Sequence, residues 1–495
     1  MKSQIEISRE LQRAREYEIN EPNRITMAEK QSFHVCAPVG WINDPNGFSE
    51  YKGEWHLFFQ YHPYSTEWGP MHWGHMKTSD FIHWEHLPAA LAPDKRYDGF
   101  GCFSGSAAEW GGSHVLAYTG VERREAEDGQ IRDYQTQCIA VGDGVNYRKI
   151  EKNPVITAEQ IPAGGSELDF RDPKIWAENG VVYMVVGNRS EDGSGQILMY
   201  QTADLENWEF VTVLDQCRNR FGRMWECPDF FPLDETHVLI VSPQEMEAKE
   251  NEFHAGDGSI CITGSFDKEN AKFTEEAVRP IDMGLDFYAP QTMLTSDGRR
   301  IMIAWMQTWS IRWFGGEDGF CGMMTLPREL HVRNGILCQN PVRELEAYYK
   351  NRIELRDIIL KKEYRKYEEL GGREQNLDIT LNSRELYRFE MRVAADDTCY
   401  SLITYDKKEQ LLTFDRSCSG VRKDAAHLRS MKVLSNNQIV ELRIVMDRYS
   451  IEIFVNDGEQ AMTSVIRTPY DRNGIYMRAD GNVTARIVKH DICVG

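Results

Sequence analysis

Residues 78–85 read Thr-Ser-Asp-Phe-Ile-His-Trp-Glu, and residues 202–209 read Thr-Ala-Asp-Leu-Glu-Asn-Trp-Glu, so one aspartate–tryptophan pattern occurs twice. A shorter copy, Asp-Gly-Val-Asn-Tyr, lies between them at residues 143–147, and a weaker copy begins at Asp267. The aspartates of these copies follow one another at intervals of about 60 residues. A unit of this length that holds several short strands is typical of a β-propeller blade.

The sequence around these copies indicates an all-β fold. From residue 34 onward, short β-branched and aromatic runs alternate with clusters of Gly, Asp, Asn and Pro. Residues 34–342 hold about five units of the repeat length, so this segment is predicted to be a five-bladed β-propeller catalytic domain.

Three other segments flank the predicted propeller. Residues 1–33 are predicted to be a helical extension, because charged residues alternate along positions 3–18. Residues 343–365 are rich in charge and are predicted to form a linker helix. Residues 366–495 contain alternating apolar and polar runs and an Asn-Asp-Gly hairpin signal at 456–458, which together predict a C-terminal β-sandwich.

Composition excludes several classes of function. The formal net charge is −20 over 495 residues, and such a charge repels nucleic acid. The first residues lack the apolar segment of a secretory signal, and no run reaches the ~20 apolar residues of a membrane span. The 11 cysteines are scattered and form no Cys-x-x-Cys pair. We therefore expect a cytoplasmic protein with reduced thiols that binds neither nucleic acid nor a membrane.

Three acidic motifs each precede an apolar β-run: Trp-Ile-Asn-Asp-Pro-Asn-Gly at 41–47, Phe-Arg-Asp-Pro at 170–173 and Trp-Glu-Cys-Pro-Asp at 225–229. Their carboxylates are Asp44, Asp172 and Glu226, and Ser104 occupies the same place in the second unit. The steps between these positions follow the blade period. Because the innermost strands of a propeller all start at one end of the central channel, we expect these side chains to converge there.

Taken singly, each motif also suits a simple turn, since Asp-Pro and Pro-Asn-Gly are common turn sequences. Together, three carboxylates at equivalent blade positions have the composition that glycoside hydrolysis needs. That reaction uses an ionised nucleophile, a protonated acid and a charge that stabilises an oxocarbenium-like centre.

The motifs resemble those of glycoside hydrolase family 32, the family of invertases, sucrose-6-phosphate hydrolases and fructanases. Further matches are Phe-Phe-Gln-Tyr at 58–61, Trp-Gly at 68–69, His-Trp-Gly-His at 72–75, Gly-Cys-Phe-Ser-Gly-Ser at 101–106 and Leu-Pro-Arg-Glu-Leu at 326–330. The resemblance covers the whole predicted propeller in order and the predicted sandwich more weakly. It implies that Asp44 is the nucleophile, Glu226 the acid/base and Asp172 the transition-state stabiliser.

The resemblance also implies a set of substrate-binding residues around the fructose ring: Trp41, Asn43, Gln60, Trp68, Phe103, Ser104 and Arg171. Arg171, next to Asp172 in sequence, is expected to keep that carboxylate ionised. Alignment of residues 301–305 with 56–60 places Trp305 where Gln60 lies in its own blade. Trp305 is therefore interpreted either as a second aromatic wall of the sugar site or as a buried structural residue.

The implied activity is retaining hydrolysis of the terminal β-D-fructofuranosyl bond of sucrose or sucrose-6-phosphate, with no cofactor. An exo-acting β-fructosidase of fructans and short fructo-oligosaccharides is the alternative substrate assignment. An inverting arabinanase-type propeller and a non-catalytic fructan-binding lectin are the rivals from other classes. No metal is expected, because the pairs His72/His75 and His83/His86 lie in β segments, where i and i+3 do not share a face. The oligomeric state is left open.

Overall fold

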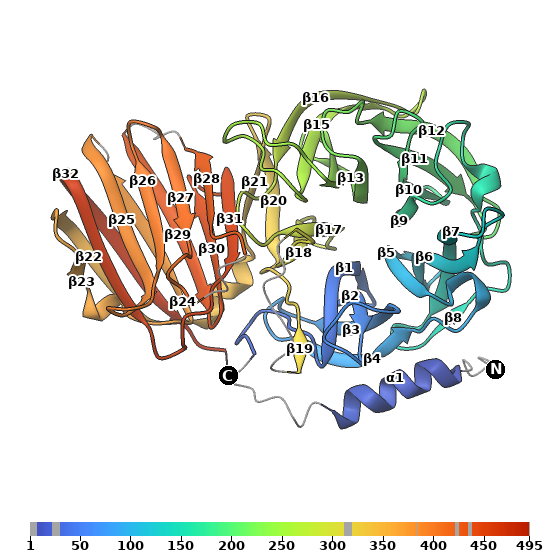
Figure 1. The fold of residues 1–495 in the computed structure, drawn as a ribbon, viewed down its shortest axis with the longest axis horizontal. Coiled ribbons are helices and arrows are strands. Elements are labelled where there is room, and N and C mark those ends of the chain that lie inside the picture. Colours follow the sequence, from blue (N-terminus) through green and yellow to red (C-terminus); the bar gives the residue numbers. More distant parts are fainter. Residues whose placement is uncertain are drawn as a thin grey trace.

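The computed structural model describes residues 7–21, 30–310, 319–382, 384–420, 425–433 and 438–494. Five β-sheets are arranged in a ring around a central axis, and a separate two-layered β-structure lies beside the ring (Figure 1). The predicted all-β class, with a five-bladed propeller followed by a C-terminal sandwich, is confirmed.

Each blade is an antiparallel sheet whose strands follow one another along the chain, with the first strand innermost. The strands of the five blades are β1 (Gly40–Tyr51), β2 (Glu54–His62), β3 (His72–Thr78) and β4 (Glu85–Leu91); β5 (Gly101–Trp110), β6 (Ser113–Glu125), β7 (Ile131–Gly142) and β8 (Tyr147–Lys149); β9 (Phe170–Glu178), β10 (Val181–Arg189), β11 (Gly195–Thr202) and β12 (Glu209–Gln216); β13 (Met224–Leu233), β14 (Thr236–Gln244), β15 (Ile260–Asp267) and β16 (Lys272–Pro280); β17 (Tyr288–Leu294), β18 (Arg300–Trp305), β20 (Arg328–Arg333) and β21 (Ile336–Pro341).

The repeated aspartates explain why the blades share one shape. Asp80 follows the third strand of blade 1, which ends at Thr78, and the Asp80 carboxylate accepts the backbone N–H groups of Ile82 and His83. In blade 3, Asp204 accepts the N–H groups of Glu206 and Asn207 in the same way. Each aspartate thus stabilises the turn that leads from the third strand to the outermost strand.

The ring is closed by a short strand, β19 (Phe320–Cys321), which pairs in parallel with the first residues of β1. The pairs are Gly40 with Phe320 and Trp41 with Cys321. Blade 1 is therefore joined to a segment that follows β18 of blade 5, and the two ends of the propeller chain hold each other.

The described part of the N-terminal extension contains the helix α1 (Arg9–Asn20), capped by Ser8, whose hydroxyl accepts the N–H of Leu11. The helix packs on β4, where Leu11 lies against Ala89 and Ala92 and Arg15 donates to the Ala89 carbonyl. Within the described residues, no helix is long and apolar enough to cross a membrane.

The predicted linker helix at 343–365 is wrong. This segment forms a short 3₁₀ helix, η4 (Arg343–Tyr348), followed by strand β22 (Tyr349–Leu360), which pairs with the long strand β32 (Gly474–Ile492). The charged residues and leucines of the segment are good helix formers, but the edge of β32 offers backbone partners that override this preference. The sandwich accordingly begins at β22 rather than at residue 366.

The sandwich consists of two antiparallel sheets that share β32. One half of β32 pairs with β25 and β23, and the other half pairs with β24 and β22. Its remaining elements are β23 (Arg365–Lys366), η5 (Glu368–Leu370), β24 (Gln375–Asn382), β25 (Glu385–Ala395), β26 (Ser401–Asp406), β27 (Leu411–Asp415), β28 (Leu428–Lys432), β29 (Ile439–Asp447), β30 (Ser450–Val455) and β31 (Gln460–Val465).

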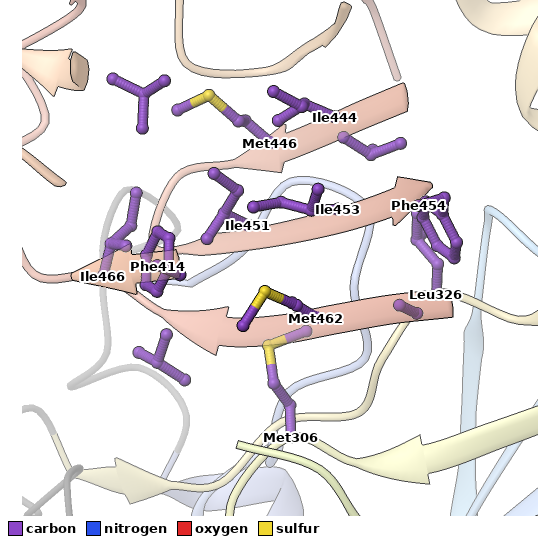
Figure 2. Close-up of a cluster of buried hydrophobic side chains, with 14 of the residues drawn as sticks. Met306, Leu326, Phe414, Ile444, Met446, Ile451, Ile453, Phe454, Met462 and Ile466 are labelled. Carbon is purple, nitrogen blue, oxygen red and sulfur yellow. The ribbon is translucent and has the colours of Figure 1, made fainter. Parts of the chain in front are cut away.

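The sandwich and the propeller share one buried hydrophobic cluster. Met306 and Leu326 of the propeller belong to it together with Met462 and Phe454 of the sandwich (Figure 2). Buried ion pairs cross the same boundary. Arg328, which is fully buried, binds Glu452 of the sandwich and Asp282 of the propeller, the latter at 3.0 Å. The boundary is thus part of the core rather than a hinge.

Candidate active site

All five innermost strands contain a β-bulge close to their first residues, where the register against the second strand shifts. In four of them a proline lies at or beside the bulge, in Asp44-Pro45, Asp172-Pro173, Cys227-Pro228 and Ala289-Pro290; Ser104-Gly105 takes this place in β5. Proline has no N–H for the ladder, and a bulge re-aims the neighbouring side chain. The backbone φ is 68° at Asp172, 47° at Cys227 and 52° at Ala289. The same local distortion therefore recurs at the same end of every blade.

Asp44 lies in the bulge of β1, in blade 1. Its Oδ2 accepts the hydroxyl of Ser104 at 2.7 Å, and the Cys227 thiol lies 3.7 Å from the same oxygen. The buried Oδ1 has no hydrogen-bond partner among the described residues. Burial, followed by repulsion from the Glu226 carboxylate, raises the pKa of Asp44 to about 6. One carboxylate oxygen of Asp44 is thus held by a hydrogen bond, and the other is available to bind a ligand.

Asp172 faces Asp44 from blade 3. The backbone N–H of Cys227 donates to Asp172 Oδ2 at 2.9 Å, and the N–H of Asp172 donates to Thr119 Oγ1 at 2.9 Å. Burial raises the pKa of Asp172, the Glu226 carboxylate raises it further, and the Arg171 guanidinium opposes both effects. The Arg171 guanidinium therefore favours the ionised form of Asp172, while burial and the like charge of Glu226 oppose it.

Arg171 is directed at the third carboxylate instead. Its Nε donates to Glu226 Oε1 at 2.8 Å, and its Nη1 donates to Asp169 Oδ1 at 2.9 Å. The hydroxyl of Tyr288, from the first residue of β17, donates to Glu226 Oε2 at 2.6 Å. Glu226 is thus oriented from both sides, and its side chain keeps 13% of its surface exposed.

The predicted sugar-binding residues lie around these carboxylates in two groups. Three polar ones, Asn43, Gln60 and Ser104, are buried. Asn43 Oδ1 accepts Trp41 Nε1 at 2.8 Å, and Gln60 Nε2 donates to the Cys102 carbonyl at 3.0 Å. Of the aromatic ones, Trp41 is buried and the other two are half-buried. Trp68 and Phe103 meet edge to face with ring centres 5.7 Å apart. A polar floor beside an aromatic wall suits a sugar, which has both hydroxyl groups and apolar ring faces.

Trp305 does not form a second wall. Its side chain is completely buried, with its ring centre 6.0 Å from Trp41 and 5.0 Å from Trp309. It therefore lies behind Trp41, and the interpretation as a buried structural residue holds.

The alignment of the blades also corrects one sequence interpretation. The blade spacing predicts that Glu226 occupies the position of Asp44, Ser104 and Asp172, but Cys227 is the residue that precedes the proline of β13. Glu226 corresponds instead to Arg171 and to Tyr288 in the neighbouring blades. The sequence Tyr-Ala-Pro at 288–290 is the fourth copy of the residue–proline pattern, and this signal could have identified Tyr288.

Among the described residues, no group of three or more His, Cys, Asp or Glu side chains could hold a metal ion. Two histidines of the pairs His72/His75 and His83/His86 contact other side chains. His75 Nε2 lies 3.0 Å from His56 Nδ1, and His83 Nδ1 lies 3.0 Å from Asp80.

Comparison with known proteins gives a consistent result. The profile of the "Glycosyl hydrolases family 32 N-terminal domain" matches residues 34–341, and that of "Glycosyl hydrolases family 32 C terminal" matches residues 344–493. A sucrose-6-phosphate hydrolase of Escherichia coli is 37% identical over 88% of this chain and 88% of its own length. A raffinose invertase of Escherichia coli is also 37% identical, over 90% of this chain and 91% of its own.

Solved structures give the same picture. A GH32 β-fructofuranosidase of Bombyx mori is 31% identical, with a TM-score of 0.84 over 97% of both chains. A variant of that enzyme has been solved in complex with sucrose. The sucrose-6-phosphate hydrolase of Lactobacillus gasseri is 27% identical, with a TM-score of 0.82 over 96% of both chains.

Proposed function

The chain belongs to glycosyl hydrolase family 32, and from that premise we propose that it hydrolyses sucrose or sucrose-6-phosphate, releasing fructose by double displacement with retention of configuration. The observation that carries the proposal is the pairing of Asp44 with Glu226. One carboxylate oxygen of Asp44 accepts a hydrogen bond from Ser104, and the other has no partner among the described residues. Glu226, in blade 4, is held in position by Arg171 and Tyr288.

In the first step, Asp44 Oδ1 would attack the anomeric carbon of fructose while Glu226 gives its proton to the departing glycosidic oxygen. The C–O bond to glucose breaks, and an ester between fructose and Asp44 forms. In the second step, Glu226 would take a proton from water, which attacks the same carbon and releases Asp44. Both partners are then restored, so the cycle consumes one water and one substrate.

Asp172 would act on the fructose ring without forming a bond to it. Its Oδ2 is held by the Cys227 N–H, which leaves the other oxygen for sugar hydroxyl groups. Hydrogen bonds from those hydroxyls strengthen as positive charge develops on the ring, so they stabilise the transition state. Asn43, Gln60 and Trp68 would complete the fructose site.

A second candidate is the exo-acting hydrolysis of fructans and short fructo-oligosaccharides, since the fructose site would be the same. The test is to compare kcat/KM for sucrose, sucrose-6-phosphate, kestose and inulin, and to follow the configuration of released fructose by NMR. We expect retention and a preference for the two disaccharides. A preference for inulin would favour the second candidate, and inversion would reject the double displacement.

We also propose a cytoplasmic location. All 11 cysteines are free thiols, and most of them are buried, which suits a reducing compartment.

A further inference from the structure

The hairpin of β6 and β7 extends past the ring of carboxylates. The innermost strand β5 begins at Gly101, which pairs with Val121 of β6, but β6 continues to Glu125. The catalytic carboxylates lie at the starts of the innermost strands. The overhanging part of the hairpin, residues 122–134, is therefore at the active-site end of the propeller.

One face of this overhang is turned toward the active site. Gln135 Oε1 accepts the Phe170 N–H at 2.8 Å and lies 3.4 Å from Arg171 Nη1. Val121 and Gln135 form a cross-strand pair, and Arg123 and Asp133 form the pair two residues further out. Side chains two residues apart on a strand share a face, so Arg123 lies on the same face, roughly 7 Å beyond Gln135.

Arg123 also covers the aromatic wall of the fructose site. Its guanidinium carbon is 3.4 Å from the ring centre of Phe100. Phe100 packs against Trp68 and Phe103, with ring centres 5.9 Å and 6.2 Å apart. The guanidinium therefore adds a further layer to this wall, on the side of Phe100.

The guanidinium of Arg123 is held in one orientation and still has an unused hydrogen-bond donor. Asp133 accepts Nε at 2.6 Å and Nη2 at 2.8 Å, which fixes the plane of the group. Nη1 has no hydrogen-bond partner within the described residues, and 47% of the side chain is exposed. Arginine in a fixed plane is well suited to a phosphate group. In a chain with a net charge of −20, an anionic substrate needs such a local cation.

We propose that Arg123 binds the phosphate of the glucose 6-phosphate leaving group and thereby determines the preference for sucrose-6-phosphate over sucrose. This inference rests on the proposed function, because it concerns the glucose side of the same substrate.

The neighbouring residue provides a matched control. Arg124 is 49% exposed, but it lies on the opposite face of the hairpin, with its guanidinium 3.9 Å from the ring centre of Tyr134. Arg123→Ala and Arg124→Ala each remove one positive charge at nearly the same place. Only Arg123→Ala removes the charge from the face of the hairpin that is directed toward the active site.

The experiment measures kcat/KM for sucrose and for sucrose-6-phosphate in the wild type and both variants. We expect Arg123→Ala to lower the ratio of sucrose-6-phosphate to sucrose roughly 10- to 100-fold, the range for one lost hydrogen bond to a charged group. Arg124→Ala should leave the ratio within about 2-fold, since its solvent-exposed charge on the opposite face of the hairpin is screened. Inhibition by glucose 6-phosphate should weaken in Arg123→Ala, while inhibition by fructose should not.

A third variant, Asp133→Asn, keeps an oxygen that can accept a hydrogen bond from Arg123 but removes the negative charge that repels a phosphate, so it should raise the ratio. An unchanged ratio in Arg123→Ala, or an equal fall in both arginine variants, would overturn the inference while sucrose turnover by the wild type still supports the proposed function. A wild type that cleaves neither substrate would instead reject the proposed function, and this inference with it.

Discussion

The hydroxyl of Tyr288 in blade 5 lies 2.6 Å from Glu226 Oε2 and 3.1 Å from the carbonyl oxygen of Ser242. A hydroxyl has one proton and two lone pairs. It can therefore donate to ionised Glu226, or donate to Ser242 while accepting the proton of neutral Glu226. The Tyr288 hydroxyl can therefore hydrogen-bond to Glu226 in both of its protonation states. A group that acts in turn as acid and as base needs such a partner.

Replacement of Tyr288 by phenylalanine should slow the step that needs proton donation. We expect kcat/KM for sucrose to fall roughly 10- to 100-fold, the usual contribution of a hydrogen bond to a charged group. A fructoside with an activated leaving group should lose much less, since its departure needs little protonation. Tyr200→Phe is the control, because that buried hydroxyl bonds to Gln160 away from the site. An equal loss on both substrates would argue against this role.

Asp44→Asn should remove hydrolysis by several orders of magnitude while the protein remains folded. The amide cannot form the ester with fructose, yet it fills the same space beside Ser104. Activity within a factor of about 10 of the wild type would reject Asp44 as the nucleophile. Circular dichroism and thermal unfolding should show a fold unchanged from the wild type.

The acid side of the pH profile should report Asp44. Because burial and Glu226 raise its pKa to about 6 and attack needs the ionised form, kcat/KM should fall as pH drops through about 6. Ser104→Ala removes a hydrogen bond that stabilises the ionised form, so the midpoint should move to higher pH. A midpoint that stays in place in Ser104→Ala would assign this limb to another group.

His34 should make stability depend on alkaline pH. The ring lies between two sandwich carboxylates, 2.8 Å from Asp447 and 2.9 Å from Glu452. Burial opposes its charge, but the hydrogen bonds and the two negative charges prevail and raise the pKa to about 9. A raised pKa in the folded state means that the stabilisation is complete below about 6.5 and is lost as pH rises through about 9.

The measurement compares the thermal unfolding of the wild type and His34→Gln from pH 6 to 10. We expect the variant to be less stable by up to about 3 kcal/mol at neutral pH, with the difference shrinking toward pH 10. Tyrosines and lysines titrate in both proteins, so they cancel in the comparison. A difference that is constant over this range would contradict a charged His34.

A chain that ends after residue 342 should be insoluble or strongly destabilised, although the proposed catalytic groups all precede that point. Removal of the sandwich would expose Met306 and Leu326 and leave Arg328 without Glu452. Breaking a buried ion pair in this way is costly in itself. A truncated propeller with full activity and an unchanged melting temperature would contradict the shared core.

The repeat allowed the propeller to be predicted because a short motif with its own turn geometry, such as Thr78 to Glu85, marks four of the five blades independently of the rest. The same spacing indicated that Asp44, Asp172 and Glu226 meet. Partners across blades could not be predicted in this way. Whether Arg171 reaches Asp172 or Glu226 depends on where bulges direct side chains, and β22 was read as helix because its pairing partner lies over 100 residues away.

The closure of the ring by β19 and the shared strand β32 has a consequence for biosynthesis. Blades 2 to 4 are built from neighbouring segments, so each can form as soon as it leaves the ribosome. Blade 1 emerges first, but its innermost strand β1 can pair with β19 only after Phe320 has been synthesised. The hydrophobic core of blade 1 also contains residues of the sandwich. The sandwich in turn cannot be completed until its shared strand β32 (Gly474–Ile492), near the C-terminus of the chain, has been synthesised. The nascent protein therefore carries an unfinished first blade until synthesis is nearly complete, and a nonsense mutation near the C-terminus would trap it in that state.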